Sequence, residues 1–150
     1  MRMSKSDVRR VIETYIKAWV DQDPDLIVTI FTDHATYNEG GITRPTIHGR
    51  EGIRAYWERK VVQEQANIKC RLLSLFLDGK TVITEWEAEF DDLPAGRRKR
   101  LGEVAILTFE GAKISSLREY WNSERVDDAS SPTGNDVMCN VSGNALLQPV

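Results

Sequence analysis

The sequence contains few of the residues that build metal sites or disulfide frameworks. It has two cysteines and two histidines in 150 residues. Cys70 and Cys139 lie far apart and form no C-x-x-C pattern, and neither His34 nor His48 completes a zinc-ligand spacing with them. We therefore expect reduced thiols, no disulfide framework and no metal site.

The sequence also lacks an excess of positive charge and a long apolar run. Lys and Arg total 20 against 23 Asp and Glu, so the net charge is −3. This sign disfavours binding to nucleic-acid phosphates. No run of 18 apolar residues occurs, and the first residues lead into an amphipathic segment rather than into the apolar core of a signal peptide. We expect a cytoplasmic protein without nucleic-acid or membrane partners.

Length and periodicity predict one domain that begins with three helices. The chain is 41% hydrophobic, enough for one core that buries about 70% of the unfolded surface. Ser4-x-x-Asp7 matches a capping box before the first helix, and Asp23-Pro24 introduces the second. The apolar stripes are Val8, Val11, Ile12, Tyr15, Ile16, Trp19 and Val20, then Leu26, Ile27, Ile30 and Phe31 with an end at Thr32 and Asp33, then Ile53, Tyr56, Trp57 and Val61.

The second half of the sequence has the period of β-strands. Asp78-Gly79 between two apolar runs is a strong hairpin signal. Three helices interrupted by one strand and followed by a four-strand meander predict an α+β domain over residues 1–125. Residues 126–150 are rich in Ser, Asp, Asn and Gly and are expected to be a tail. The expected strands are Ala35–Glu39, Ile68–Leu77, Thr81–Phe90, Lys99–Phe109 and Lys113–Trp121.

Alternation along the strands predicts which side chains face the helices. In the expected strand Lys99–Phe109, Val104 and Ile106 are apolar and lie on the face opposite Leu101 and Glu103. Both faces of this strand therefore need to be covered. We expect a second subunit to cover one of them, so that the protein is a homodimer. The basic run 97–100 is expected to keep a sheet edge out of intermolecular pairing.

Three carboxylates fall on faces otherwise made of apolar and aromatic residues: Glu39, Glu103 and Glu119. Desolvation raises the pKa of such a carboxyl, which suits general acid or base chemistry near neutral pH. The simpler interpretations are a turn-capping Glu39, a solvated Glu103 opposite the basic run, and an ion-paired Glu119.

Several short motifs resemble the nuclear transport factor two-like superfamily, which includes ketosteroid isomerase, limonene-epoxide hydrolase, scytalone dehydratase and SnoaL-like cyclases. They are Tyr15-Ile16 eight residues before Asp23, the Ile47-His48-Gly49-Arg50-Glu51-x-Ile53 turn, and Glu119-Tyr120-Trp121-Asn122. The resemblance covers residues 5–124. It implies a cone-shaped, mostly antiparallel curved sheet wrapped around an N-terminal group of three helices, a cystatin-like α+β barrel.

The resemblance also implies roles for individual residues. Tyr15 matches the oxyanion-binding tyrosine of ketosteroid isomerases, Glu39 their proton-shuttling aspartate, and Trp121 a pocket tryptophan. Their second oxyanion donor, a protonated aspartic acid, corresponds to Ala105, and only Glu103 on the same face could replace it. In limonene-epoxide hydrolase, Tyr37 and Glu119 match polar pocket positions, whereas its catalytic arginine and aspartate fall on Trp86 and Ala88, which disfavours epoxide hydrolysis by that arrangement.

Two functions are therefore weighed. The first is a cofactor-independent acid–base enzyme of the isomerase, dehydratase or cyclase type, in which Glu39, beside Tyr15, is the base and Tyr15 and protonated Glu103 stabilise an oxyanion. The alternative is a non-catalytic module for ligand binding or dimerisation. The ligand is expected to be small, hydrophobic and neutral or cationic, because no Lys or Arg is assigned to the inward face of a strand and only Arg44 could reach the mouth. The expected substrate-binding residues are Trp19, Tyr37, Trp57, Trp86, Glu119 and Trp121.

Overall fold

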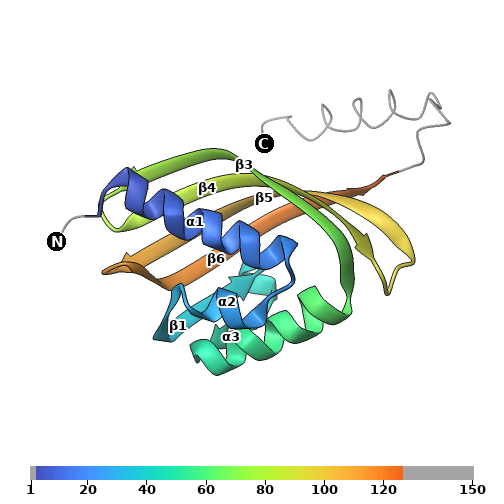
Figure 1. Ribbon diagram of the computed structural model, residues 1–150, viewed down its shortest axis with the longest axis horizontal. Coiled ribbons are helices and arrows are strands. Elements are labelled where there is room, and N and C mark those ends of the chain that lie inside the picture. Colours follow the sequence, from blue (N-terminus) through green and yellow to red (C-terminus); the bar gives the residue numbers. More distant parts are fainter. Residues whose placement is uncertain (1–2, 127–150) are drawn as a thin grey trace, which may run out of the picture.

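The computed structural model describes residues 3–126, which form three helices, two short helical turns and one sheet (Figure 1). The elements are α1 (Lys5–Val20), α2 (Pro24–Val28), β1 (Phe31–Glu39), the 3₁₀ turn η1 (Gly41–Thr43), β2 (Ile47–His48), α3 (Gly49–Trp57), the π-helix η2 (Glu58–Gln63), β3 (Gln65–Asp78), β4 (Thr81–Asp92), β5 (Arg97–Glu110) and β6 (Lys113–Arg125).

The six strands form one curved sheet in the order β2-β1-β6-β5-β4-β3. All neighbours are antiparallel except β1 and β6, which run parallel. Figure 1 shows α1 lying over one face of this sheet and α3 beside β1. The inner face of the sheet is the one covered by the helices, and the outer face is the opposite one. The α+β cone with three helices is confirmed.

The first helix follows from its sequence as expected. Ser4 accepts a hydrogen bond from the backbone N–H of Asp7, and the Asp7 side chain accepts from the backbone of Ser4, which completes the capping box. Val8, Ile12, Tyr15, Ala18 and Trp19 are buried on one side of the helix. This side carries Tyr15 and Trp19 into the cone.

Two local predictions are wrong. Phe31 begins β1 rather than ending the second helix, because the backbone of Ile30 already accepts a hydrogen bond of 2.8 Å from Ile114 of β6. The basic run 97–100 does not protect a sheet edge, since β5 lies between β4 and β6. The backbone groups of β5 are therefore paired on both sides.

The helix that begins at Gly49 changes its geometry after Trp57. It continues as the π-helix Glu58–Gln63, and Trp57 and Val61 remain buried. Gln22, with a φ of 54°, donates its side-chain amide to the carbonyl oxygens of Val61 and Gln65, both at 2.7 Å. The first bond pairs a carbonyl of the π-helix and the second a carbonyl at the start of β3, so Gln22 ties the end of α1 to both elements.

Two predictions concern parts of the chain that the structure describes only in part. The proposed tail, 126–150, lies outside the described residues from 127 onward, as does Cys139. Cys70 is a half-buried free thiol on β3. Within residues 3–126, no helix is long and apolar enough to cross a membrane.

Candidate active site in the cone

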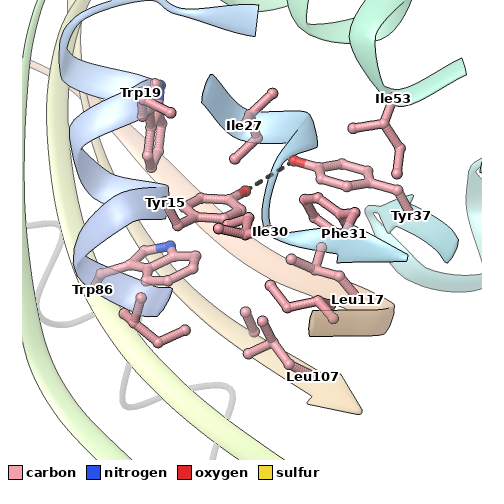
Figure 2. Close-up of a cluster of buried hydrophobic side chains, with 14 of the residues drawn as sticks. Tyr15, Trp19, Ile27, Ile30, Phe31, Tyr37, Ile53, Trp86, Leu107 and Leu117 are labelled. Atoms are coloured by element: carbon pink, nitrogen blue, oxygen red, sulfur yellow. Dashed lines mark hydrogen bonds between the residues drawn. The ribbon is translucent and has the colours of Figure 1, made fainter. Parts of the chain in front are cut away.

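Aromatic side chains from α1, β1, α3 and β4 surround the centre of the cone. The ring of Tyr15 stacks on Trp86 with centroids 4.9 Å apart and meets Trp57 edge-on at 5.5 Å. Figure 2 shows the hydroxyls of Tyr15 and Tyr37 pointing toward one another, and their oxygens are 3.0 Å apart. Rigid packing of these rings fixes where each hydroxyl lies.

The three predicted carboxylates form a row across three adjacent strands. Glu39 on β1 pairs in register with Glu119 on β6, and Glu103 on β5 pairs with Trp121, which places it diagonally beside Glu119. Strand alternation directs all three toward the inner face. Their assignment to one site from the sequence agrees with this arrangement.

Glu119 lies at the centre of the row and is 3% exposed. Its carboxylate accepts hydrogen bonds from the hydroxyls of Tyr15 at 2.5 Å and of Tyr37 at 3.3 Å. Burial raises the pKa of Glu119 to about 7, and the charge of Glu39 adds to this effect, while the two hydroxyls lower it. Among the described residues, no Lys or Arg forms an ion pair with this group.

Glu103 is 5% exposed and accepts a hydrogen bond of 2.6 Å from Trp86 Nε1. Burial, followed by the charge of Glu119, raises the pKa of Glu103 well above its ordinary value, and its protonated carboxyl donates a hydrogen bond to Glu119. Two buried carboxyls in contact cannot both ionise at neutral pH. Each of these two carboxyls therefore favours its protonated form more than a carboxyl in water does.

Glu39 faces the cavity but has a different partner from the one expected. Its carboxylate accepts a hydrogen bond from the hydroxyl of Tyr56, whereas the carboxylate bonded to Tyr15 is Glu119. Glu39 is also only half-buried. It occupies the outer end of the carboxylate row, with Glu119 at the centre and Glu103 at the inner end.

The cavity above these groups has a volume of about 220 Å³. It opens between the π-helix, the end of β4 and the start of β5. The lining comprises Tyr15, Trp19, Tyr37, Glu39, Arg44, Tyr56, Trp57, Lys60, Val61, Glu64, Gln65, Phe90, Asp92, Lys99, Leu101, Glu103, Glu119 and Trp121. Figure 2 shows part of the buried cluster beneath it.

Basic residues at the mouth correct one expectation. Arg44 lines the cavity as predicted, but Lys99 on β5 and Lys60 on the π-helix do so too. Lys99 pairs with Asp92 at 3.0 Å, and Lys60 with Glu64 at 2.9 Å. Both lysines are therefore neutralised by acids of the same lining.

The predicted tryptophans have separate places. Trp19 lines the cavity and donates Nε1 to Gln65 at 2.8 Å, whereas Trp86 lies beneath Tyr15 and outside the lining. Trp121 is 37% exposed at the mouth, with Lys99 Nζ 5.9 Å from its ring centre. Trp57 is 1% exposed and lines the cavity.

The cavity-lining residues that were not identified from the sequence as site residues include Tyr56, Lys60, Asp92 and Lys99. Alternation could have identified two of them, because Lys99 shares its face with Leu101 and Glu103, and Asp92 shares its face with Phe90. Lys60 could not be placed by helical periodicity, since it lies in the π-helix. In the part of the chain that the structure describes, no group of three or more His, Cys, Asp or Glu is arranged to hold a metal ion.

Comparison with known proteins gives one family and many structures. The model of the SnoaL-like domain matches residues 12–117. No curated protein matches the chain. The three solved structures described next are at most 23% identical to this chain, so their similarity concerns the fold alone.

SalBIII, described as an epoxide hydrolase/cyclase-like enzyme in pyran ring formation in the polyether salinomycin, has a TM-score of 0.69 at 23% identity over 82% of this chain and 98% of its own. A hypothetical protein with a ketosteroid isomerase-like fold from Catenulispora acidiphila, in complex with trimethylamine, has a TM-score of 0.66 at 21% identity over 73% of this chain and 83% of its own. An epoxide hydrolase of the LEH-like type from M. tuberculosis has a TM-score of 0.64 at 18% identity over 78% and 84%.

Proposed function

The chain belongs to the SnoaL-like domain family, and from this premise we propose that it is a cofactor-independent acid–base enzyme acting on a small hydrophobic molecule. The reaction is of the isomerase, dehydratase or cyclase type. The observation that supports the proposal most directly is the buried pair of Glu103 and Glu119, which lines the cavity together with Tyr15 and Tyr37 and whose pKa values burial raises. We place this activity in the cytoplasm, where the thiol of Cys70 stays reduced.

Glu119 is the better candidate for the base than Glu39. With a pKa of about 7, it is partly ionised at neutral pH and yet basic enough to accept a proton from carbon. Tyr15 and Tyr37 hold its carboxylate in one orientation. Glu39, at the outer end of the row, is the competing assignment.

The proton transfer is written for a carbonyl compound. Glu119 takes a proton from the carbon next to the carbonyl. The electron pair of the broken C–H bond forms a carbon–carbon double bond, and the π pair of the carbonyl moves onto its oxygen to give an enolate. A hydrogen bond from a nearby donor stabilises this charge. Returning the proton to another carbon gives an isomer, whereas expulsion of a hydroxyl that takes up a proton gives an alkene and water.

The alternative is a non-catalytic module that binds a small ligand. The cavity restricts the occupant to a small molecule in either function, because about 220 Å³ is below the range of roughly 300–1,000 Å³ usual for ligand pockets. The two functions differ in one respect: only the enzyme moves protons.

Exchange of substrate hydrogens for solvent deuterium tests this difference without knowledge of the product. Small hydrophobic ketones are incubated with the protein in D₂O, and the loss of the hydrogens next to the carbonyl is followed by NMR. We expect faster exchange with the protein than in buffer, with a rate that rises with pH through about 7, the pKa of Glu119. Exchange at the buffer rate across a broad panel would contradict the proposal and favour the binding module.

A further inference from the structure

Trp86 contacts the carboxylate site but does not line the cavity. It is fully buried on β4 and pairs in register with Glu103 on β5. Its Nε1 donates a hydrogen bond of 2.6 Å to Oε1 of Glu103, and its ring stacks on Tyr15, as Figure 2 shows. The hydroxyl of Tyr15 in turn donates to Glu119. Trp86 thus contacts two groups of the site without facing the space that a ligand would occupy.

The packing of the core does not require this contact. Phenylalanine at position 86 would still place a ring against Tyr15, and it would bring no N–H that needs a buried acceptor. Glutamine at position 103 would accept the same hydrogen bond without placing an ionisable group among buried side chains. An indole donor bonded to a buried acid therefore calls for an explanation beyond stability.

The bond from Trp86 fixes which oxygen of Glu103 carries a proton. In a protonated carboxyl the carbonyl oxygen is the better hydrogen-bond acceptor, so Oε1, which accepts from the indole, is the carbonyl oxygen and Oε2 carries the proton. This protonated carboxyl donates a hydrogen bond to Glu119. The indole therefore holds Glu103 in the orientation in which it is a donor to Glu119.

The same bond strengthens Glu103 as a donor. Hydrogen bonds in a chain polarise one another, so an acid that accepts at its carbonyl oxygen donates more strongly through its hydroxyl. Burial raises the pKa of Glu119 to about 7, and the bond from Glu103 is one of the contacts that oppose this increase. Without the indole N–H, Glu119 would need a higher pH to ionise.

Titratable groups from the other elements packed around Glu103 act on the same equilibrium. They are Tyr15 on α1, Glu39 and Tyr37 on β1, Tyr56 on α3, Cys70 on β3 and Glu119 on β6. The cavity lining adds Arg44 and the ion pairs of Lys60 with Glu64 and Lys99 with Asp92. All of these groups are the same in the two variants compared below, so a difference between those variants reports the indole.

We propose that Trp86 is a positioning residue, whose indole N–H holds Glu103 as a hydrogen-bond donor to Glu119 and thereby sets the pH above which Glu119 is available as a base. The role as a base rests on the proposed function. The control of Glu119 by Trp86 does not, because the ionisation of a carboxyl is measurable without a substrate.

The first experiment observes the contact in the unmodified protein. With ¹⁵N-labelled tryptophan, the indole signals of Trp19, Trp57 and Trp121 are assigned by single Trp→Phe variants, which leaves Trp86 as the last of the four. We expect the Trp86 N–H to move downfield as the pH rises through about 7, where Glu119 ionises, because a stronger bond from Glu103 to Glu119 strengthens the bond that Oε1 accepts. The Trp19 signal is the control, since its acceptor is the uncharged side chain of Gln65.

The second experiment removes the donor. Trp86→Phe keeps a ring against Tyr15, and ¹³C-labelled glutamate gives a carboxyl signal for Glu119 that Glu119→Gln assigns. We expect the titration midpoint of Glu119 to rise by about 0.5–1 pH unit, part of the effect of one hydrogen bond to an ionised group. The pH profile of deuterium exchange should move by the same amount.

Phe109→Leu is the matched control for the loss of core volume. Phe109 is buried on β5 outside the cavity lining, and its side chain has no donor. This variant should leave the midpoint of Glu119 unchanged. An equal shift in both variants would mean that the midpoint follows packing, and it would overturn the proposal.

Two further results would overturn it: a Trp86 signal that does not respond to pH, or a Glu119 midpoint that stays or falls in Trp86→Phe. If Trp86→Phe does not fold, the titration of the Trp86 signal in the unmodified protein decides. A raised midpoint in a protein that shows no deuterium exchange would contradict the proposed enzyme and leave the control of Glu119 by Trp86 intact.

Discussion

The two faces of the sheet shift the pKa values of their carboxylates in opposite directions. Glu87 on β4 and Glu103 on β5 are close neighbours, since Glu87 pairs in register with Gly102, but they point to opposite sides. On the outer face, hydrogen bonds from Arg71 and then Arg100 lower the pKa of Glu87. On the inner face, burial and the charge of Glu119 raise the pKa of Glu103.

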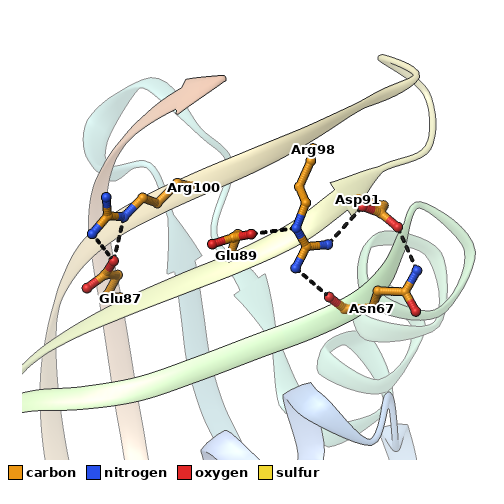
Figure 3. Close-up of polar contacts among 6 residues, drawn as sticks. All are labelled: Asn67, Glu87, Glu89, Asp91, Arg98 and Arg100. Atoms are coloured by element: carbon orange, nitrogen blue, oxygen red, sulfur yellow. Dashed lines mark hydrogen bonds and ion pairs between the residues drawn. The ribbon is translucent and has the colours of Figure 1, made fainter. Parts of the chain in front are cut away.

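The outer arrangement repeats along β4. Figure 3 shows Arg98 between Glu89 and Asp91, with Asn67 bonded to Asp91 from the neighbouring strand. Every acid in the figure has a basic or amide partner, whereas Glu103 and Glu119 have hydroxyls, an indole and each other. The outer acids are ion-paired, whereas burial of the inner pair has a cost to stability that is expected of a functional site.

The largest expected effect compares one acid from each face in the deuterium-exchange assay. Glu119→Gln keeps the shape of the side chain and removes the base, so the enzyme-dependent exchange rate should fall by about 10²–10⁴-fold, roughly 3–5 kcal/mol of barrier. Glu87→Gln on the outer face is the control and should leave the rate unchanged.

Glu39→Gln separates the two candidate bases in the same assay. We expect a smaller loss than for Glu119→Gln, because Glu39 is bonded to Tyr56 and lies at the outer end of the row. If Glu39→Gln abolishes exchange and Glu119→Gln does not, the base is Glu39.

The next effect concerns the apolar part of the outer face. Phe76, Ile83, Val104 and Tyr120 are between 37% and 62% exposed on adjacent strands, and we propose that a second copy of the chain covers them. Light scattering should give a dimer at micromolar concentration. Val104→Asp places a charge at the centre of this surface and should weaken the dimer by roughly thirtyfold or more, about 2 kcal/mol.

Leu93→Asp is the matched control, since Leu93 is 51% exposed in the turn after β4 and outside that surface. It should leave the dimer intact. A monomer in the unmodified protein would remove the proposed interface.

The next prediction concerns how the free energy of unfolding changes with pH. Because burial raises the pKa of Glu119 from 4.5 to about 7 in the folded state, the folded protein binds more protons than the unfolded chain in this interval, and the stability contributed by this group is lost as the pH rises through it. Glu119→Gln should therefore increase the free energy of unfolding at pH 8 by roughly 1–3 kcal/mol. Urea denaturation of the unmodified protein and of Glu119→Gln, at pH 5 and at pH 8, measures the free energies of unfolding to be compared.

Glu87 and Asp91 on the outer face should show the opposite dependence on pH. Their pKa values are lowered in the folded state, so the stability that they contribute is lost as the pH falls below the ordinary pKa of these carboxyls. Stability of Glu119→Gln that is unchanged or lower at pH 8 would contradict the assignment of a destabilising buried carboxylate.

The smallest effect is expected from the outer ion pairs. Arg100→Ala removes the contacts to Glu87, but Arg100 is half-exposed, and exposed pairs contribute about 0.2–1 kcal/mol. Thermal denaturation should show a small decrease in melting temperature relative to the unmodified protein. High salt should make this difference smaller. A loss of several kcal/mol would mean that the outer pairs are structural supports comparable with the core.

Local patterns in the sequence predicted most of the fold. The capping box and the apolar stripe of α1, the Asp78-Gly79 turn and the alternation in β4, β5 and β6 each depend on neighbouring residues. Phe31 was misplaced because its strand is defined by pairing with β6, more than eighty residues later. The interior position of β5 is likewise a property of strand order, which local composition does not encode.

The sequence indicated which carboxylates lie on the inner face, but not which side chains contact one another. Alternation placed Glu103 and Glu119 on the inner face, and burial of both is confirmed. Which carboxylate meets Tyr15 depends on the parallel register of β1 and β6, and Glu39 was chosen without that register. The Lys60 and Tyr56 contacts depend on α3 and the π-helix, whose change of period is not visible in the apolar pattern.

The parallel pairing of β1 with β6 also has a consequence for how the molecule is made. The hydrogen bond between Tyr15 and Glu119 joins residues 104 positions apart, so the site depends on one of the longest contacts in the chain. Such contacts form late and slowly, because a large loop must close first. During synthesis, the helices and β3, β4 and β5 can emerge before Tyr15 meets Glu119. Because β6 carries Glu119 and also pairs with β1, docking of this one strand both holds β1 in the sheet and assembles the candidate site.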